Sequence, residues 1–291
     1  MAVNLTDAFL ELIRRASTDL PPDVCAAIEK ARRREKAGSP ARSVFSQIQD
    51  NIRLAREKST PICQDTGTNI YSIHLPIDMP HAVVEKAILA ATRKAVKKSY
   101  LRPNAVDSVT GANSGDNTGV GQPQIHFHQW KKKHLEVSLM LKGGGCENVG
   151  RQYALPNAEL GAGRDLEGVR RVVIDAIQQA QGLGCAPGCL GVGIGGDRGS
   201  SYLLSKEQFL RTLDDVNLDP ALKKLENRLL RELNQLGIGP MGFGGKTTVL
   251  STKIGKMHRL PASFFVSVSY MCWAFRKARM TVRGEKVTHG Y

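Results

Sequence analysis

No stretch of the sequence is apolar over 18 consecutive residues, so we expect no segment to cross a membrane as a helix. The first twenty residues carry acidic side chains at helical spacing and lack the basic segment, apolar core and cleavage site of a secretory signal. Aromatic residues make up only 5% of the chain, and internal repeats and low-complexity segments are absent. We therefore expect a folded cytoplasmic protein with no membrane partner.

The sequence also lacks the C-x2-C pairs that build zinc ribbons and zinc fingers. Only Cys185 and Cys189 lie close together, and a single C-x3-C pair is a weak metal-binding signal. In a cytoplasmic protein, cysteines are more often thiols or metal ligands than disulfides. The six candidates are Cys25, Cys63, Cys146, Cys185, Cys189 and Cys272.

The formal net charge of +14 is consistent with several kinds of anionic partner. Basic residues fall in short scattered runs, such as 32–34 and 131–133, and no ribonucleoprotein or zinc-finger pattern accompanies them. Solvated helix faces and loops account for such runs, so we expect no nucleic-acid partner. A zinc-binding or nucleic-acid-binding protein without enzymatic activity remains the alternative of another class.

Apolar periodicity predicts an α+β fold in which a helical N-terminal region, residues 1–60, precedes a mixed α/β body, residues 61–291. We expect the body to form one integrated domain. The N-terminal helices begin near residues 5, 23 and 40. Further helices are expected at 80–100, 166–181 and 206–236, the last interrupted near Asp219-Pro220, and strands at 123–129, 135–141, 189–195 and from residue 264 onward.

Two of the glycine-rich stretches imitate nucleotide-binding motifs. Residues 191–196 satisfy G-x-G-x-x-G, but they lie inside an apolar run, and the next helix is expected only around 200–205. The run GFGGKTT at 242–248 lacks the first glycine of a P-loop, because that position is Pro240. We interpret these glycines as places where the backbone approaches something bulky or anionic.

Five motifs surround three of the cysteines and the glycine-rich loops. They are PICQDTGT at 61–68, KGGGCEN at 142–148, LGCAP at 183–187 with the strand that follows it, GIGPMGFGGK at 237–246, and PAS with YMC at 261–263 and 270–272. In this order they resemble the motifs of class I fumarate hydratases and the related L(+)-tartrate dehydratases. The resemblance covers one subunit's worth of chain.

The resemblance implies a hydro-lyase in which Cys63, Cys185 and Cys272 hold a [4Fe–4S] cluster. Three thiolates leave one iron without a protein ligand, and that iron can activate the hydroxyl of a small dicarboxylic acid. The reaction expected first is hydration of fumarate to malate, and dehydration of L(+)-tartrate is the alternative. The family completes its active site with a second module, so the chain looks like an α subunit that needs a β subunit in an α2β2-type assembly.

The same motif matching implies the residues that meet the substrate. Gln64 and Asp65 would contact it beside the cluster, Arg102 would hold a carboxylate, and Gly145 would offer a backbone contact. Asp65 is the candidate general acid/base on the substrate hydroxyl, although an Asx turn also explains an aspartate there. His258 is a weaker candidate for substrate binding.

Several residues depart from the family pattern or compete with it. Leu260 stands where relatives carry a histidine, which is why His258 is considered at all. Cys146 replaces a serine and is interpreted as a non-ligand, whereas Cys189 lies close enough to Cys185 to compete as a ligand. Cys25 is expected to be structural, and His126 and His128 are expected to be polar strand residues.

Overall fold

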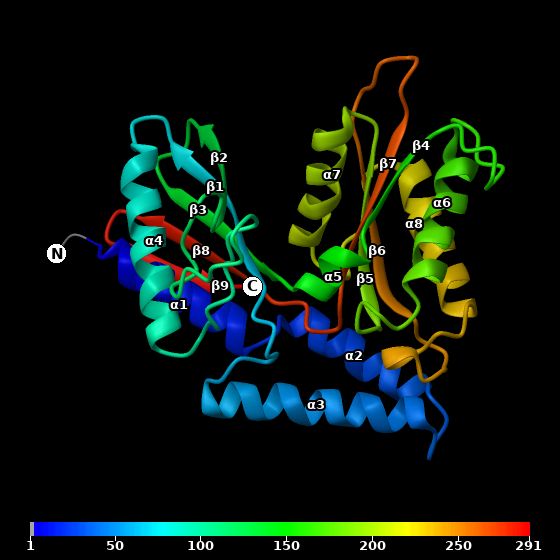
Figure 1. Cartoon of the computed structure of the whole chain (residues 1–291), viewed down its shortest axis with the longest axis horizontal. Helices are drawn as coiled ribbons and strands as arrows, with labels where there is room; N and C mark the ends of the chain where they lie inside the picture. The colour runs from blue at the N-terminus through cyan, green and yellow to red at the C-terminus, as the bar shows by residue number, and fades with distance from the viewer. Residues whose placement is uncertain (1–2) are drawn as a thin grey trace. The chain divides into compact units, whose positions relative to one another are not determined.

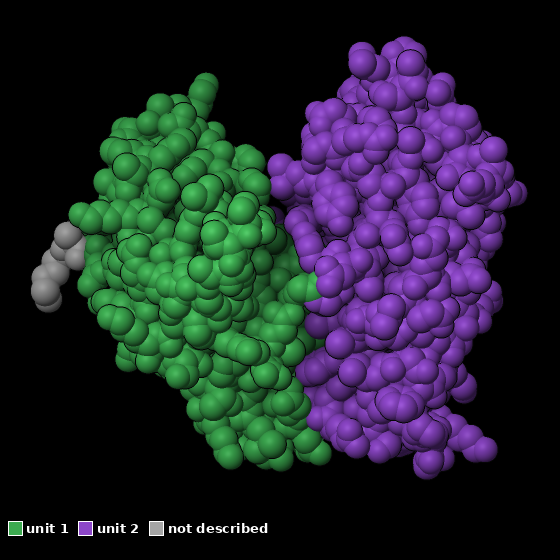
Figure 2. All heavy atoms as spheres, in the orientation of Figure 1, with its two compact units in different colours: residues 1–22, 50–144, 274–291 green, residues 23–49, 145–273 purple. Residues whose placement is uncertain are grey.

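The computed structural model describes residues 3–291, which divide by their contacts into two compact units. The first unit comprises Met1–Pro22, Asp50–Gly144 and Ala274–Tyr291, and the second comprises Asp23–Gln49 and Gly145–Trp273 (Figure 2). The boundary predicted at residue 60 separates a helical region from a mixed α/β body. It concerns the kind of secondary structure, whereas the two units are defined by contacts, so the boundary stays a prediction.

The three helices expected in the N-terminal region are confirmed as α1 (Leu5–Thr18), α2 (Pro22–Arg34) and α3 (Pro40–Lys58). The Asn4 side chain accepts a hydrogen bond from the backbone of Asp7 and so caps α1. Helix α3 begins after Ser39, whose hydroxyl accepts from the Arg42 backbone, and proline occupies its first position.

The first unit is built on a five-stranded sheet with the order β2-β1-β3-β8-β9. Strand β2 is parallel to β1, and the other neighbours are antiparallel. Helices α1 and α4 (His81–Lys97) cover one face of this sheet (Figure 1), and their apolar side chains form a core with those of β1, β3 and β8. The strands are β1 (Thr68–Pro76), β2 (Gln124–Trp130), β3 (Leu135–Lys142), β8 (Lys277–Arg283) and β9 (Lys286–Gly290).

The second unit contains a four-stranded sheet with the order β4-β7-β5-β6, in which β5 is parallel to β6 and antiparallel to β7. Helix α7 (Arg198–Glu207) lies on one side of this sheet, and α6 (Leu166–Ala180) and α8 (Pro220–Gln235) lie on the other (Figure 1). A short helix, α5 (Gly144–Asn148), precedes β4. The strands are β4 (Arg151–Ala154), β5 (Gly188–Ile194), β6 (Val249–Lys256) and β7 (Phe265–Met271).

The glycines of β5 allow helix α7 to pack directly on the strand. A Cβ atom added to Gly191 or Gly193 would overlap the backbone carbonyl oxygen of Ser205 or Ser201, both on α7. The Ser201 hydroxyl also donates a hydrogen bond of 3.2 Å to the carbonyl of Gly193. Close packing of a helix on a strand therefore explains the G-x-G-x-x-G match, with no nucleotide needed.

The helix expected over 206–236 is wrong in its first part. Helix α7 begins at Arg198, where the N-cap Asp197 and Ser200 of the first turn form a capping box, and ends at Glu207. A 3-10 turn, η1 (Gln208–Leu210), follows, and residues 211–219 are not helical before Asp219 caps α8. The non-helical segment is held by Asp215, which accepts hydrogen bonds from Arg211 and from Lys253 of β6.

The α+β class predicted from the sequence is confirmed by these two mixed units. Within residues 3–291, none of the helices combines the length and the apolar character that a membrane-spanning segment needs.

Candidate functional site

Asp65 fixes the loop that carries Cys63 in the first unit. One carboxylate oxygen accepts a hydrogen bond of 3.0 Å from the backbone of Gly67, which closes an Asx turn, and the other accepts one of 2.7 Å from Gly144. The buried guanidinium of Arg276 donates to the carbonyl of Asp65 at 2.6 Å. Asp65 therefore joins the cysteine loop to the triple-glycine loop that follows β3.

Gly67 is required at the start of β1 for two independent reasons. Its φ angle of +79° lies in the left-handed region, and an added Cβ atom would lie 2.7 Å from the backbone carbon of Lys142. The glycine of the QDTGT motif thus allows the cysteine loop to pass against the end of β3.

Thr66 brings Arg102 to the same loop. The Thr66 hydroxyl accepts a hydrogen bond of 3.2 Å from the backbone of Arg102, and the side-chain amide of Asn117 donates to the Arg102 carbonyl at 2.7 Å. The Arg102 guanidinium is exposed and forms no ion pair with any residue that the structure describes. The first unit therefore gathers four predicted site residues, which are Cys63, Gln64, Asp65 and Arg102.

Cys185 occupies a strained position in the second unit. Its φ angle is +56°, a left-handed conformation that costs a residue other than glycine about 1 kcal/mol or more. Glycines flank it on both sides, and a Cβ atom added to Gly184 or Gly188 would overlap the ring of Tyr270. The loop therefore wraps closely around this tyrosine.

Cys272 reaches the same end of the sheet from strand β7. Met271, the last residue of β7, pairs with Cys189 at the start of β5. Cys272 follows Met271, and Cys185 lies just before β5, so both cysteines are at the same end of these two strands. The second unit thus brings two of the three predicted cluster ligands to one end of its sheet.

Cys146 connects the segments that carry these two cysteines. Its buried sulfur accepts a hydrogen bond of 3.3 Å from the backbone of Cys272 and contacts the carbonyl oxygen of Gly184 at 4.0 Å. Sequence reasoning assigned Cys146 no role beyond that of a non-ligand. Its position between both segments is a long-range property that no local pattern reveals.

Tyr270 is the residue at this site that sequence reasoning missed. It is 1% exposed, and its phenol oxygen is buried without a hydrogen-bond partner. Burial raises the pKa of Tyr270 well above its ordinary value, and the nearby sulfur atoms raise it further. These sulfurs belong to Cys272, Cys146, Cys189 and Cys185.

The remaining predicted site residues lie apart from this group or on its border. Gly145 is exposed on α5, one residue before Cys146. His258 is exposed, and its carbonyl accepts a hydrogen bond from Gly196, at the end of β5 opposite to Cys185. A seven-residue strand is about 20 Å long, so the second unit does not bring His258 together with Cys185 and Cys272.

The other residues considered from the sequence have ordinary surroundings. Cys25 is half-buried on α2 and Cys189 is buried within β5. His128 lies on β2 and stacks on His74 of β1, with ring centroids 5.0 Å apart, and His126 precedes it on the same strand. Within residues 3–291, no three histidine, cysteine or acidic side chains form a group able to hold a metal ion.

The thiols of the second unit fit a sulfur-ligated cofactor. Cysteine thiolates are the ligands of iron–sulfur clusters, and the orphaned Tyr270 hydroxyl lies where a group rich in hydrogen-bond acceptors would satisfy it. Cys63 belongs to the first unit, and the structure describes each unit by itself.

These features define an α+β protein whose glycine-lined loops carry thiols. The chain belongs to the fumarate hydratase (Fumerase) family, whose model matches residues 6–281. It is 51% identical over 276 residues to a protein of Geobacillus stearothermophilus named "Putative fumarate hydratase class I", an alignment that covers 94% of this chain and 54% of the relative. It is 31% identical over 287 residues to the L(+)-tartrate dehydratase subunit alpha of Escherichia coli strain K12, covering 98% of this chain and 93% of the relative. The family predicted from the motifs is thereby confirmed, and the chain spans about half the length of the Geobacillus protein.

Proposed function

We propose that the chain is the α subunit of an iron–sulfur hydro-lyase that reversibly hydrates fumarate to malate. The observation that carries the proposal is the 51% identity to a class I fumarate hydratase over nearly the whole chain. The division into subunits is supported by the likeness to a separate tartrate dehydratase α subunit, 93% of which the alignment covers. A β subunit would complete the active site, and an α2β2-type assembly is proposed on the same family likeness.

The proposed cofactor is a [4Fe–4S] cluster held by Cys63, Cys185 and Cys272. Its support is the family and the thiol-rich surroundings of Tyr270 in the second unit. When bound, such a cluster supplies a Lewis acid for the substrate hydroxyl.

The exposed side chains of the first unit would bind and orient the substrate. The Arg102 guanidinium, which forms no ion pair within residues 3–291, can pair with a carboxylate through two parallel hydrogen bonds. Asp65 would move a proton at the substrate hydroxyl, and its two backbone donors would fix its orientation. Gln64 and the backbone of Gly145 would add polar contacts, whereas His258 lies outside the residues that carry this proposal.

L(+)-tartrate dehydration is the second candidate activity, and the 31% identity to a tartrate dehydratase α subunit over 98% of this chain favours it. Separate assays of fumarate, malate and L(+)-tartrate with the α and β subunits expressed together would decide between the two. Turnover of fumarate and malate is expected, and turnover of tartrate alone would overturn the first choice in favour of the second.

The cluster is tested by purifying the chain without oxygen and measuring its iron, its sulfide and its absorbance at about 400 nm. Cys63→Ser, Cys185→Ser and Cys272→Ser are each expected to lose iron. Cys25→Ser is the matched control, because Cys25 lies on α2 among the helices, and it should retain iron. A colourless wild-type protein that holds zinc instead would favour the non-enzymatic alternative.

The proposed cellular location is the cytoplasm, and neither a nucleic acid nor a membrane is a proposed partner. Light scattering of the complex of α and β subunits would measure the assembly, for which four chains are expected.

A further inference from the structure

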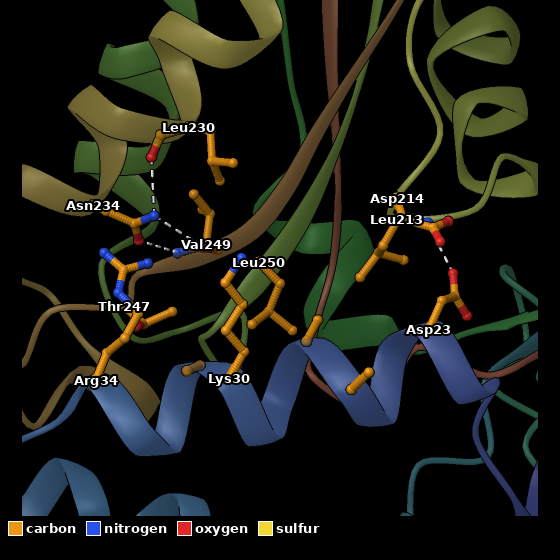
Figure 3. Close-up of a pocket in the computed structure, with 13 residues that line it drawn as sticks. Asp23, Lys30, Arg34, Leu213, Asp214, Leu230, Asn234, Thr247, Val249 and Leu250 are labelled. Carbon is orange, nitrogen blue, oxygen red and sulfur yellow. Dashed lines mark hydrogen bonds between the residues drawn. The ribbon is translucent and has the colours of Figure 1, made fainter.

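A cavity of about 360 Å³ lies in the second unit between α2, the non-helical segment that contains Leu213, helix α8 and strand β6 (Figure 3). This volume falls within the range of small-molecule sites. None of the residues proposed above for the hydro-lyase reaction lines it.

One end of the cavity is basic. Lys30 and Arg34 stand on successive turns of α2 and point into the cavity (Figure 3), and neither forms an ion pair within residues 3–291. Arg32 and Arg33 of the same helix differ, because both form ion pairs with Glu29. An adjoining cavity that shares Arg34 adds further cations, Arg231 and Lys246. The unneutralised charge exceeds what a single carboxylate would balance.

Thr247 adds a buried hydroxyl beside these cations. The residue is 2% exposed, lines the cavity next to Arg34, and has a hydroxyl oxygen without a hydrogen-bond partner. Its neighbour Asn234 is saturated, since its amide bonds to the backbone of Leu230, Thr248 and Val249. A buried hydroxyl left unpaired destabilises the fold, and a ligand that accepts its hydrogen bond would remove that cost.

The opposite end of the cavity is acidic. Asp23 and Asp214 line it, and one oxygen of Asp23 accepts a hydrogen bond from the Leu213 backbone at 2.8 Å. Between the two ends, the lining is apolar, with contributions from Leu213, Leu230, Val249 and Leu250. The cavity therefore suits a ligand with an anionic end, an apolar middle and hydrogen-bond donors at the far end.

The length of α2 excludes compact ligands. At the helical rise, Asp23 is about 10 Å from Lys30 and about 16 Å from Arg34 along the helix axis. A four-carbon dicarboxylate or a free amino acid is too short to engage both ends. A nucleoside diphosphate has the required length, because its phosphates and its base or sugar hydroxyls lie at opposite ends of the molecule.

We propose that this cavity binds a nucleoside diphosphate. Lys30, Arg34 and the Thr247 hydroxyl bind the phosphates, the apolar lining covers the base, and the carboxylates at the Asp23 end accept hydrogen bonds from its amino or hydroxyl groups. This would be a ligand site separate from the proposed hydro-lyase chemistry.

Titration calorimetry of the full chain with ADP, pyrophosphate and adenosine as separate probes tests the proposal. ADP is expected to bind more tightly than either fragment, and more weakly at high salt, because exposed cations are screened. No heat with ADP would overturn the proposal. If pyrophosphate binds as tightly as ADP, the nucleoside contributes nothing and its proposed role is wrong. If adenosine binds as tightly as ADP, the proposed role of the cations in binding the phosphates is wrong.

Variants locate the binding on the cavity. Arg34→Gln is expected to weaken ADP binding about tenfold, equivalent to 1.4 kcal/mol. Arg33→Gln on the same helix is the matched control and should leave binding unchanged, since Arg33 is absent from the lining and forms an ion pair with Glu29. Equal weakening by both variants would mean a general charge effect and would sink the proposed site.

Thr247→Val separates binding from folding. Because the hydroxyl has no partner within residues 3–291, this variant should fold with undiminished stability and yet bind ADP several-fold more weakly. Unchanged ADP affinity would contradict the role of Thr247. Binding should persist in Cys185→Ser, so the failure of this proposal and the failure of the hydro-lyase proposal can be told apart.

Discussion

The orphaned phenol of Tyr270 makes an unusual stability prediction. Replacing a buried tyrosine by phenylalanine normally destabilises a protein, because the hydroxyl loses a hydrogen bond. The Tyr270 hydroxyl is buried and has no hydrogen-bond partner to lose among the residues that the structure describes. We therefore expect Tyr270→Phe to stabilise the cluster-free chain or to leave its stability unchanged.

The magnitude follows from two opposing contributions. Burying an unpaired hydroxyl costs about 1–3 kcal/mol, and its removal recovers that desolvation energy. The small void left behind offsets part of the gain, because interiors are close-packed and the lining loses contacts. A net gain of about 0.5–2 kcal/mol in the free energy of unfolding is expected.

Urea unfolding of the cluster-free chain measures this difference. Tyr270→Phe should keep the wild-type m-value and unfold at an equal or higher urea concentration. Tyr153→Phe is the matched control in the same unit, since the Tyr153 hydroxyl donates a hydrogen bond of 2.7 Å to Asp175, and it should cost about 1 kcal/mol. A loss of stability in Tyr270→Phe as large as in the control would show that the phenol is hydrogen-bonded, and the reasoning would fail.

Two further substitutions test packing and charge. Gly188→Ala should destabilise the chain by about 1–3 kcal/mol in thermal unfolding, because its Cβ atom overlaps a buried ring, whereas Gly119→Ala, with nothing within 4 Å, should be neutral. Burial raises the pKa of Asp215, but hydrogen bonds from Arg211 and Lys253 outweigh burial and hold it below the ordinary 3.8. A depressed folded-state pKa stabilises the fold above the unfolded-state value and loses that effect as the pH falls through the folded value. Asp215→Asn should therefore unfold at a lower urea concentration than wild type at pH 7. The difference between the two urea midpoints should become smaller below the ordinary pKa of 3.8, and a difference that is constant with pH would contradict this.

The elements that the sequence predicted are those with a strong local pattern. The three N-terminal helices, α4 and α6 have clear apolar periodicity, and β5 is an uninterrupted apolar run. Strands β6 and β8 were missed because they carry lysine and arginine, and Lys253 of β6 is buried only because Asp215 pairs with it. The same long-range pairing explains why residues 211–219 are not helical.

The division into units could not be predicted from local patterns. Strand β3 pairs with β8, from which it is separated in sequence by the larger segment of the second unit, Gly145–Trp273. At the site, neighbouring motif residues located Cys63, Cys185 and Cys272, but the contacts of Cys146 join segments 38 and 126 residues away. Such contacts leave no periodic signal in the sequence.

The thiol-rich end of the second unit has a functional character that does not depend on family resemblance. Cys185 has a left-handed backbone, two glycines beside it are needed to clear a ring, and that ring carries an unsatisfied hydroxyl. The left-handed cysteine and the unpaired hydroxyl are each unfavourable in isolation, and a sequence selected for stability alone would replace them with a glycine and a phenylalanine. Strained and unsatisfied groups persist where function requires them, and their concentration around four sulfurs argues that this loop is kept to bind a ligand.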